Sequence, residues 1–358
     1  MKYTINFTGH ISCVEPLTVS IQNSAFGASE HRLPRNGANT SKTQPFFPAS
    51  SIRGKLRNET HLALLKTIKQ ANQGENPMDI HDHFMLAQGV DSARRVDSSK
   101  PGAGVTDAHK ELRETNPMLS LFGRWGLASK VSVGLALPET DDCWGMFGGG
   151  FRGVMFEKNQ DLLQELNSDD TDLLERIMIE QAAKAADKAG LKSQKQALLR
   201  QVKKATEEEK ENLYAQANEI QAQIDLNEKD TGIGPETTIR RPIDEFEAFT
   251  AGALLKHRMA LNGATKAELG LFLLGLQRFA RNPRLGGHTA HNCGLIEASW
   301  VVTTWPEEEE SPVILGKVAL GAEGFSIETS DNPYASLLDH AMDTFRESFD
   351  QYDFKAVG

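Results

Sequence analysis

The sequence is divided by a long segment, residues 159–229, whose composition favours helix throughout. It contains no proline and one glycine, Gly190, and is rich in Ala, Gln, Glu, Lys and Leu. Its apolar residues recur at helical spacing: Leu162, Leu163, Leu166, Leu173, Leu174, Ile177, Met178, Leu198, Leu199, Val202, Leu213, Ala217, Ile220 and Ile224. Breaks near 167–170 and Gly190 predict two or three helices that fold back on one another. With 10 basic and 15 acidic residues it is most simply a solvated insertion; an arm that contacts a neighbouring subunit or a nucleic-acid strand is the alternative.

The flanking segments mix strand and helix patterns, which predicts an α+β fold. Expected strands are 3–21 (one or two strands), 130–137, 151–157 and 294–304, and expected helices are 50–72, 265–281 and 333–349. Ser50 or Ser51 is expected to cap the helix over 50–72. The helix over 265–281 is the clearest, because Leu269, Phe272 and Leu276 share one face.

Composition limits the class of protein. A chain of 358 residues suggests two domains, or one with a large insertion. No apolar run is long enough to span a bilayer, and three well-separated cysteines argue against a disulfide framework, so a cytoplasmic protein without membrane contact is expected. The net charge of −10 is unevenly distributed. Residues 31–58 contain no Asp or Glu but six cations, Arg32, Arg35, Lys42, Arg53, Lys55 and Arg57, which indicates an anionic partner unless this is an ordinary basic loop.

The segment 46–57, Phe-Phe-Pro-Ala-Ser-Ser-Ile-Arg-Gly-Lys-Leu-Arg, is the first candidate phosphate site. A helix N-terminus with two serines offers N–H and O–H donors and a positive dipole end. Arg53 and Arg57 share one flank at i and i+4, while Gly54 allows another backbone to approach. An ordinary helix with solvated cations is the alternative.

A Gly-rich turn, 285–296, follows the clearest helix. It carries Gly286, Gly287, His288, His291 and Cys293, which invites a zinc interpretation, but a fourth ligand at matching spacing is absent. We therefore expect no metal and no cofactor, and interpret the turn as a loop that approaches a sugar–phosphate backbone.

Three further motifs carry less. Residues 148–153 match GxGxxG, but the following residues continue a strand pattern, so a tight turn is expected and dinucleotide binding is not. Residues 81–83, His-Asp-His, are expected in a loop. Residues 232–260 are expected to form a hairpin whose Arg240, Arg241, Ile243 and Phe246 would lie against single-stranded nucleic acid; a plain surface hairpin is the alternative.

Four pieces occur in a familiar order: 16–20 (Pro-Leu-Thr-Val-Ser), 48–57, 121–123 (Leu-Phe-Gly), and the helix 265–281 with its Gly-rich turn. The order resembles the RAMP superfamily of CRISPR proteins, in particular the backbone subunit that polymerises along guide RNA in class 1 effector complexes. The resemblance covers the chain except 159–229 and roughly the last forty residues.

The resemblance implies a ferredoxin-like (RRM-like) palm, 1–158 and 230–358, with finger and thumb insertions and the helical insertion 159–229. It implies that Ser50, Ser51, Arg53, Lys55 and Arg57 hold the guide backbone, with help from Gly286, Gly287 and His288. Arg240 and Arg241 would lie on the thumb, which interrupts the guide–target duplex. The implied partners are guide RNA, a target DNA strand, further copies head to tail and other effector subunits.

One departure bears on chemistry. Type III backbone subunits that cut target RNA use an aspartate in the loop before the helix-start motif, and here residues 31–48 contain no carboxylate. The chain is therefore expected to be non-catalytic and to resemble the type IV backbone subunit most. Two alternatives remain open: a RAMP-type ribonuclease that uses His31, His288 or His291, and a helical scaffold protein in which 159–229 is the functional part.

Overall fold

The computed structural model describes residues 1–18, 32–34, 43–93, 107–140, 142–151, 166–202, 207–229 and 242–356. The chain forms two compact units. The first contains Met1–Phe147 and Phe246–Gly358, and the second contains Gly148–Glu245.

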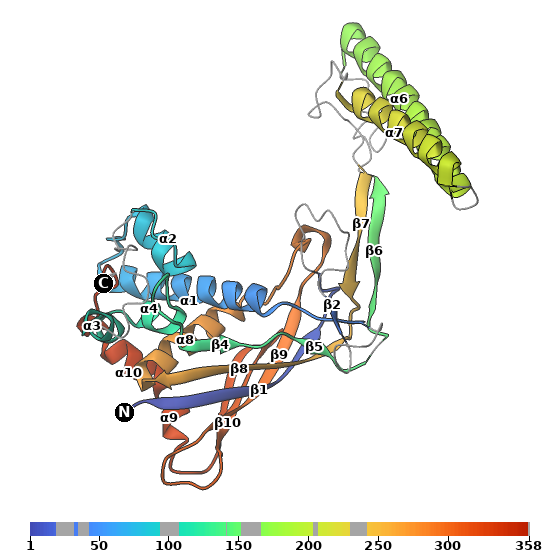
Figure 1. Ribbon diagram of the computed structural model, residues 1–358. Coiled ribbons are helices and arrows are strands. Elements are labelled where there is room, and N and C mark those ends of the chain that lie inside the picture. Colours follow the sequence, from blue (N-terminus) through green and yellow to red (C-terminus); the bar gives the residue numbers. More distant parts are fainter. Residues whose placement is uncertain are drawn as a thin grey trace. The chain divides into compact units, whose positions relative to one another are not determined.

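The first unit is built on an antiparallel sheet with the strand order β11-β10-β9-β1-β8-β4, and β5 also pairs with β8 (Figure 1). The strands are β1 (Tyr3–Cys13), β4 (Val131–Val133), β5 (Leu137–Pro138), β8 (Leu254–Ala264), β9 (Ile296–Thr304), β10 (Val313–Gly321) and β11 (Gly324–Thr329). Helices α1 (Ala49–Ala71) and α8 (Lys266–Phe279) connect them.

The order of these elements is that of the expected α+β, ferredoxin-like palm. Along the chain, β1, α1, β4/β5, β8, α8 and β9 give the pattern βαββαβ, and in the sheet β9 and β8 flank β1, with β4 and β5 outside β8. Strands β10 and β11 extend the sheet beyond β9. The fold class predicted from the sequence is confirmed.

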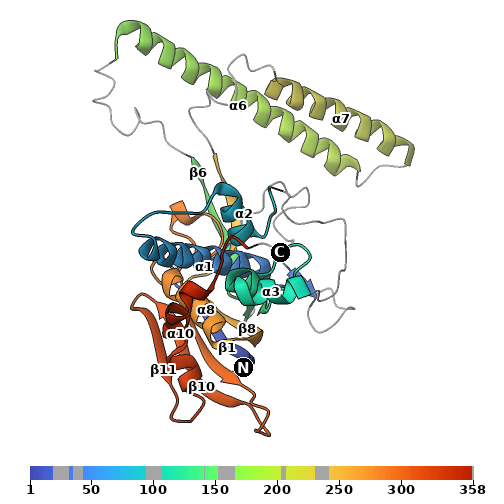
Figure 2. The same cartoon turned by 90° about the vertical axis from the view of Figure 1, so that its left-hand side faces the viewer.

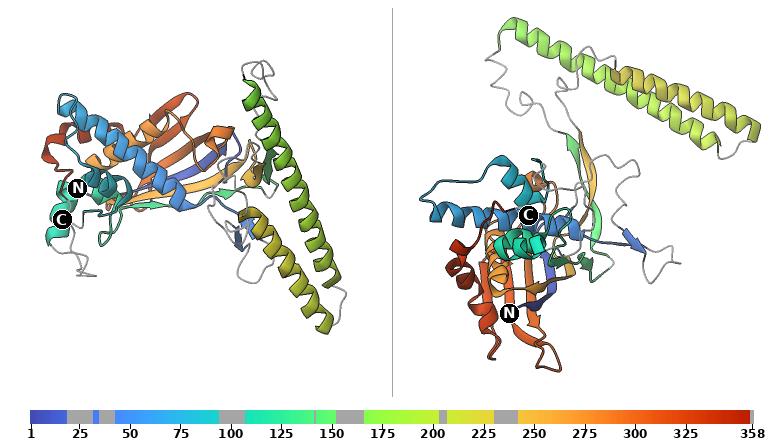
Figure 3. Two further views of the ribbon diagram at one scale, coloured as in Figure 1. Left: turned by 90° about the horizontal axis from the view of Figure 1, so that it is seen from above. Right: turned by 60° about the vertical axis from the view of Figure 1, so that its left-hand side comes forward.

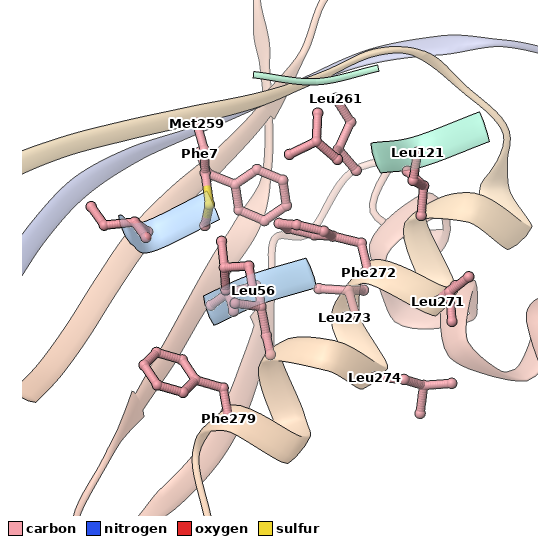
Figure 4. Packing of buried hydrophobic residues seen from close by; sticks show 14 of the residues in the cluster. Phe7, Leu56, Leu121, Met259, Leu261, Leu271, Phe272, Leu273, Leu274 and Phe279 are labelled. Atoms are coloured by element: carbon pink, nitrogen blue, oxygen red, sulfur yellow. The ribbon is translucent and has the colours of Figure 1, made fainter. Parts of the chain in front are cut away.

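Alternation along the strands gives the sheet one apolar face. On β1, Ile5, Phe7 and Ile11 are buried, while the exposed Asn6, Thr8 and His10 point to the other, more polar face. Helices α1 and α8 cover the apolar face, and α10 (Ala341–Glu347) packs against α8 (Figure 2). Figure 4 shows the resulting core, which includes Phe7, Leu56, Leu121, Met259, Leu261, Leu271, Phe272, Leu273, Leu274 and Phe279.

Helix α8 lies at the centre of this core, and its first residues carry a capping motif that the sequence makes visible. Thr265 and Glu268 form a capping box at its start. The Glu268 carboxylate also lies 2.7 Å from Lys130 Nζ. Two glycines permit close crossings: a Cβ on Gly275 would lie 2.1 Å from Thr60 Oγ1 of α1, and one on Gly270 would lie 2.0 Å from the Ala341 carbonyl oxygen of α10.

The remaining elements of the first unit are short. They are β2 (Arg32–Pro34), β3 (Thr43–Pro45), α2 (Ile80–Gln88), α3 (Asp107–Thr115), α4 (Pro117–Phe122), α9 (Ser336–Asp339) and the 3-10 turns η4 (Thr289–His291) and η5 (Phe349–Gln351). The expected helix over 333–349 is wrong as one element, because the chain breaks between α9 and α10 at His340. Residues 81–83 lie in α2, where Asp82 completes a capping box with Asp79, so the expected loop is also wrong.

A two-stranded ribbon, β6 (Trp144–Phe151) with β7 (Pro242–Phe249), corrects two expectations. Residues 148–150 belong to strand β6 and do not form a tight turn. Residues 232–260 are not one hairpin, because β7 pairs with β6 and β8 belongs to the main sheet. The strand expected over 151–157 is described only at Phe151, where β6 ends.

The second unit contains α6 (Ser168–Val202) and α7 (Glu207–Lys229), which lie side by side (Figure 3). Their contact buries Val202, Ala217 and Ile224, and Lys195 Nζ donates to Gln221 Oε1 at 2.7 Å. Helix α6 continues through Gly190, where a break was expected. None of the described helices is both long and apolar enough to cross a bilayer.

Candidate nucleic-acid interface

The first turn of α1 starts one residue earlier than its serines suggest. Pro48 occupies the N-cap position and no side chain caps the helix, so the expectation that Ser50 or Ser51 is the cap is wrong. Both serines instead lie within the first turn, with Ser50 exposed and Ser51 half-buried. The turn contains no acidic residue, and it therefore keeps the donors and dipole that favour an anion.

Arg57 requires a correction, because the structure places it in the interior. Its side chain is 4% exposed. Nε donates to the Leu86 carbonyl oxygen at 2.6 Å, Nη2 to that of Met85 at 2.9 Å and Nη1 to that of Phe122 at 3.3 Å. Burial lowers the pKa of Arg57 to about 10, with a smaller contribution from Arg53. Its donors bind main-chain carbonyls of α2 and α4, so Arg57 holds the fold together and has no surface to offer a phosphate.

Arg53 is half-buried and performs part of the same task. Its Nη2 donates to the Phe122 carbonyl oxygen, which Arg57 also contacts. Burial lowers the pKa of Arg53. The following Gly123 has φ +68°, and a Cβ there would lie 2.4 Å from the Leu127 carbonyl oxygen. The 121–123 motif and the helix-start motif therefore contact each other, through the Phe122 carbonyl oxygen and the two arginines.

Lys55 and Gly54 lie on the more open side of α1. Lys55 Nζ is 2.8 Å from Glu59 Oε1 and lies over the Phe279 ring, 5.5 Å from its centroid. The Lys55 side chain is 30% exposed, so it retains access to solvent. Gly54 is exposed, and a Cβ there would meet nothing within 4 Å.

The Gly-rich loop is anchored at its start by Thr18. Gly287 N donates to the Thr18 carbonyl oxygen at 2.9 Å. Gly286 has φ +74°, and a Cβ there would lie 1.8 Å from the same oxygen, so both conformation and space require glycine. His288 and Asn292, at either end of η4, have φ 56° and 55°. With Gly294 at 89°, four residues within 286–294 have positive φ, the largest such cluster in the described chain.

An ion pair holds the other end of the loop. Arg284 Nη2 donates to Glu15 Oε1 at 2.9 Å, Arg284 Nη1 contacts Glu15 Oε2, and Nη1 donates to the Cys293 carbonyl oxygen at 2.8 Å. The hydrogen bond to Arg284 lowers the pKa of Glu15, and the same bond raises that of Arg284. Gly294 N also donates to the Pro16 carbonyl oxygen at 2.8 Å. The loop is therefore tied to the segment that follows β1 at both ends.

These ties bring His288 onto Phe246 of β7. The two rings are stacked, with centroids 4.1 Å apart and an interplanar angle of 9°. Phe147, on the paired strand β6, also stacks on Phe246, and the centroids of these two rings are 6.4 Å apart. Thr18 connects the pieces, because its Oγ1 donates to the Glu247 carbonyl oxygen at 2.7 Å while its own carbonyl binds the Gly-rich loop. All three rings are half-buried, and His291 beside them is exposed.

The structure therefore joins the predicted residues into two groups of contacts. Arg53 and Arg57 meet at the Phe122 carbonyl, and Gly286, Gly287 and His288 meet Thr18 and Phe246. Six predicted residues fall outside this description. Arg32 lies in β2 and Ile243 in β7, but their side chains are not described, and Arg35, Lys42, Arg240 and Arg241 lie outside the described residues altogether.

Two aromatic residues of this region were not predicted. Phe147 directly precedes three glycines, which favoured a turn over a strand, and its stacking partner Phe246 is distant in the sequence. Trp125 is 77% exposed at a tight turn in which Arg124 N and Leu127 N bond reciprocally to each other's carbonyl oxygen, at 3.1 and 2.9 Å. Its signal in the sequence is the Trp-Gly pair directly after 121–124.

The zinc interpretation finds no cluster among the described residues, where no three His, Cys, Asp or Glu side chains gather in a way that could hold a metal ion. The His288 and His291 ring centroids are 6.1 Å apart. Cys293 is buried, its Sγ lies 3.6 Å from the His291 carbonyl oxygen, and burial raises its pKa.

Comparisons with known proteins find similarity among solved structures. No protein-family model matches the sequence, and no curated protein matches it. Among solved structures, one chain of a structure described as "Type IV-B CRISPR Complex" is similar over 86% of this chain and 93% of that chain, at 14% sequence identity and a TM-score of 0.38. That TM-score is too low to establish a shared fold.

Proposed function

We propose that this chain is a backbone subunit of a class 1 CRISPR effector complex, of the type IV kind, that holds guide RNA and does not cut it. Copies bind one RNA head to tail. Together with other effector subunits they present the guide for pairing with a target DNA strand, so that base pairing reads the sequence while the protein binds backbone and shape. The order of motifs in the sequence supports the family, and the geometry of the loop region supports the binding.

The stack of Phe246 on His288 is the observation that carries the proposal. Nucleic-acid bases stack on aromatic faces, and each such contact is worth about 1–3 kcal/mol. Here the aromatic pair lies beside Gly286 and Gly287, which the Thr18 carbonyl holds in place, so the stacked rings and the main chain of the loop are offered together. The two predicted features, an aromatic contact and a Gly-rich loop, are therefore one surface.

The structure changes the set of residues that we propose to bind phosphate. Ser50, Ser51, Arg53 and Lys55 remain candidates because they are exposed or half-buried at the start of α1. Arg57 leaves the set because its guanidinium is bonded inside the fold. Contacts to about four phosphates predict a slope near −3 when log affinity is plotted against log salt, at about 0.7 per contact for single strands.

The absence of cutting is part of the proposal and is supported by the residues before α1. Metal-assisted or general-base cleavage needs a carboxylate or an imidazole beside the scissile phosphate. Residues 31–48 supply no carboxylate, and their one imidazole is that of His31, which the ribonuclease alternative would use. His288 stacks its ring on Phe246, which suits holding a base better than moving a proton.

The test begins with the purified protein. We expect an absorbance ratio at 260 and 280 nm that indicates bound RNA and that falls after nuclease treatment. RNA-stripped protein should then bind labelled single-stranded RNA with the salt dependence given above and leave it intact on long incubation with Mg²⁺ or Mn²⁺. Cleaved RNA would favour the ribonuclease alternative, and a preparation that binds no RNA at any salt concentration would favour the helical scaffold.

A further inference from the structure

The connection between β9 and β10 displays an indole ring on the protein surface. Trp305 is 59% exposed, yet the loop that carries it is well fixed. Its Nε1 donates to the Glu309 carbonyl oxygen at 2.9 Å, Glu309 N donates to the Pro306 carbonyl oxygen at 3.2 Å, and Tyr334 Oη donates to Glu309 Oε1 at 3.3 Å. An exposed tryptophan whose ring is already held in place is typical of a contact surface. Because the fold has already fixed the side chain, binding a partner costs little further conformational entropy.

Four glutamates follow this tryptophan in the loop. Residues 307–310 are all Glu and all exposed, and we call them, with Trp305 and Pro306, the acidic tip. Glu307, Glu308 and Glu310 form no ion pair with any other residue of the described chain. Neighbouring carboxylates repel one another, so a cationic partner would relieve this repulsion. The acidic tip therefore combines an apolar anchor with concentrated negative charge.

A groove of the opposite character lies on the outer side of α1. It has a volume of about 510 Å³, and its lining includes Leu62, Leu65, Lys66, Lys69 and Arg278. The two leucines are half-buried and form an apolar floor, while the two lysines are exposed. No acidic residue lines the groove, and we call it the α1 groove.

The cations of the α1 groove differ in how free they are. Arg278 Nε lies 3.4 Å from Glu59 Oε2, and Glu59 also binds Lys55 at 2.8 Å, so one carboxylate is shared by two cations. Lys66 and Lys69 have no ion pair with a described residue. The groove therefore carries net positive charge that nothing in the described chain neutralises.

We infer that the acidic tip of one copy docks in the α1 groove of another. Trp305 meets the floor formed by Leu62 and Leu65, and the glutamates meet Lys66 and Lys69. An aromatic anchor in an apolar hollow, with complementary charges at the rim, is the usual construction of a specific interface. Because the acidic tip and the α1 groove are different surfaces of the same chain, their contact is heterologous and repeats from copy to copy.

A second copy fits the α1 groove better than nucleic acid does. Phosphates would use Lys66 and Lys69 but would leave the leucine floor unused, whereas the acidic tip uses both. The inference names the protein contact for the head-to-tail assembly proposed above and rests on that proposal only for the expectation that copies lie next to one another. The contact itself requires no RNA, so it can be tested without it.

The experiment measures self-association of RNA-stripped, full-length protein by sedimentation velocity at about 50 mM and about 200 mM salt. Wild type should associate at low salt and less at higher salt. Two charge reversals, E307K/E308K/E310K on the tip and K66E/K69E in the groove, should each weaken association at least about tenfold. Mixing the two variants should restore it, because the lysine tip then meets the glutamate groove and the glutamate tip meets the unchanged groove.

Matched controls separate a local contact from a change of net charge. E323K/E328K/E347K and K110E/K317E alter the same numbers of charges at exposed positions away from both surfaces and should associate as wild type does. W305A should weaken association without altering the net charge.

The outcomes decide the inference. Loss in both reversal variants with recovery in the mixture supports it. RNA-free wild type that stays monomeric at low salt, or a mixture that does not recover, overturns it. If K66E/K69E lowers RNA affinity and leaves self-association unchanged, the groove belongs to nucleic acid and the inference is also overturned. The self-association outcomes do not depend on whether the wild type binds RNA, so failure here is distinct from failure of the proposed function.

Discussion

Phe246 and His288, which are 42 positions apart and lie on a strand and a loop, stack with their ring centroids 4.1 Å apart and their planes 9° from parallel. Neither residue is positioned by its own element alone. Thr18 holds both, through its hydroxyl to the Glu247 carbonyl and through its carbonyl to Gly287 N. The surface proposed to bind RNA is thus assembled by the short segment that follows the first strand.

If this stack binds RNA, removing one of its rings and replacing a ring with another aromatic ring should affect RNA affinity differently. Phe246→Ala and His288→Ala should each weaken single-stranded RNA binding by about 1–3 kcal/mol, the usual value of one base–aromatic contact. His288→Phe should retain most of the affinity because it keeps the aromatic face. Filter binding with RNA-stripped protein measures the change, and His340→Ala, an exposed histidine away from the loop, is the control. Equal affinity of the two alanine variants and wild type would count against the stack as a binding surface.

The cations of α1 should divide into a structural and a binding class. Arg57→Lys cannot reach three carbonyls with one ammonium, so it should lower the free energy of unfolding by about 2–4 kcal/mol, since buried hydrogen bonds to charged groups are lost. Lys55→Gln removes a single ion pair whose cation is 30% exposed, so its cost in stability should stay below about 1 kcal/mol while RNA affinity falls. Urea denaturation and RNA titration, performed on both variants, distinguish the classes. A stable Arg57→Lys protein with weakened RNA binding would contradict this division.

Two glycines offer a matched pair of substitutions. Gly286→Ala places a methyl group 1.8 Å from the Thr18 carbonyl at φ +74°, so the loop must move and both stability and RNA affinity should fall. Gly54→Ala lies in open space within a helix, so it should raise the free energy of unfolding by about 0.5–1 kcal/mol. RNA titration of Gly54→Ala then tests whether a backbone approaches α1 there: a stabilised protein with reduced affinity is the expected result. Unchanged affinity would remove Gly54 from the interface.

Local patterns predicted the fold far better than the site. The helix over 265–281 was recognisable because its apolar period and its Thr265–Glu268 capping box are both local, and the structure has it at Lys266–Phe279. Arg57 was misjudged for the opposite reason. Its spacing from Arg53 shows that the two share a flank, but only the return of α2 and α4 onto that flank determines that it is buried.

The same limit applies to the aromatic stack and to the glycines of β6. Residues 148–150 look like a turn until β7, roughly a hundred positions later, pairs with them. Phe246 and His288 were each predicted as candidates, but for different surfaces, because their meeting depends on Thr18 and on backbone angles that a residue pattern does not encode. Expectations that depend on contacts between distant segments are therefore the ones that required the structure.

Two buried histidines predict how stability depends on pH. Burial lowers the pKa of His61, with smaller contributions from His83 and Arg57, and burial lowers that of His257, each to about 4. Both are therefore neutral in the folded protein near neutral pH. The unfolded chain binds a proton at each position below its ordinary pKa of about 6.5, so acid favours unfolding. Stability should be full above about pH 6.5 and should fall, by up to about 1.4 kcal/mol per pH unit for each histidine, as the pH decreases toward 4.

The measurement is the free energy of unfolding from urea titrations at several values between about pH 7 and about pH 5. His257→Gln should lower stability at neutral pH, because the ring accepts a hydrogen bond from Trp300 Nε1 at 3.1 Å, and should also make the pH dependence shallower by the share of one histidine. If wild type and His257→Gln lose stability with equal slopes, His257 is not one of the groups that make the folded protein sensitive to acid.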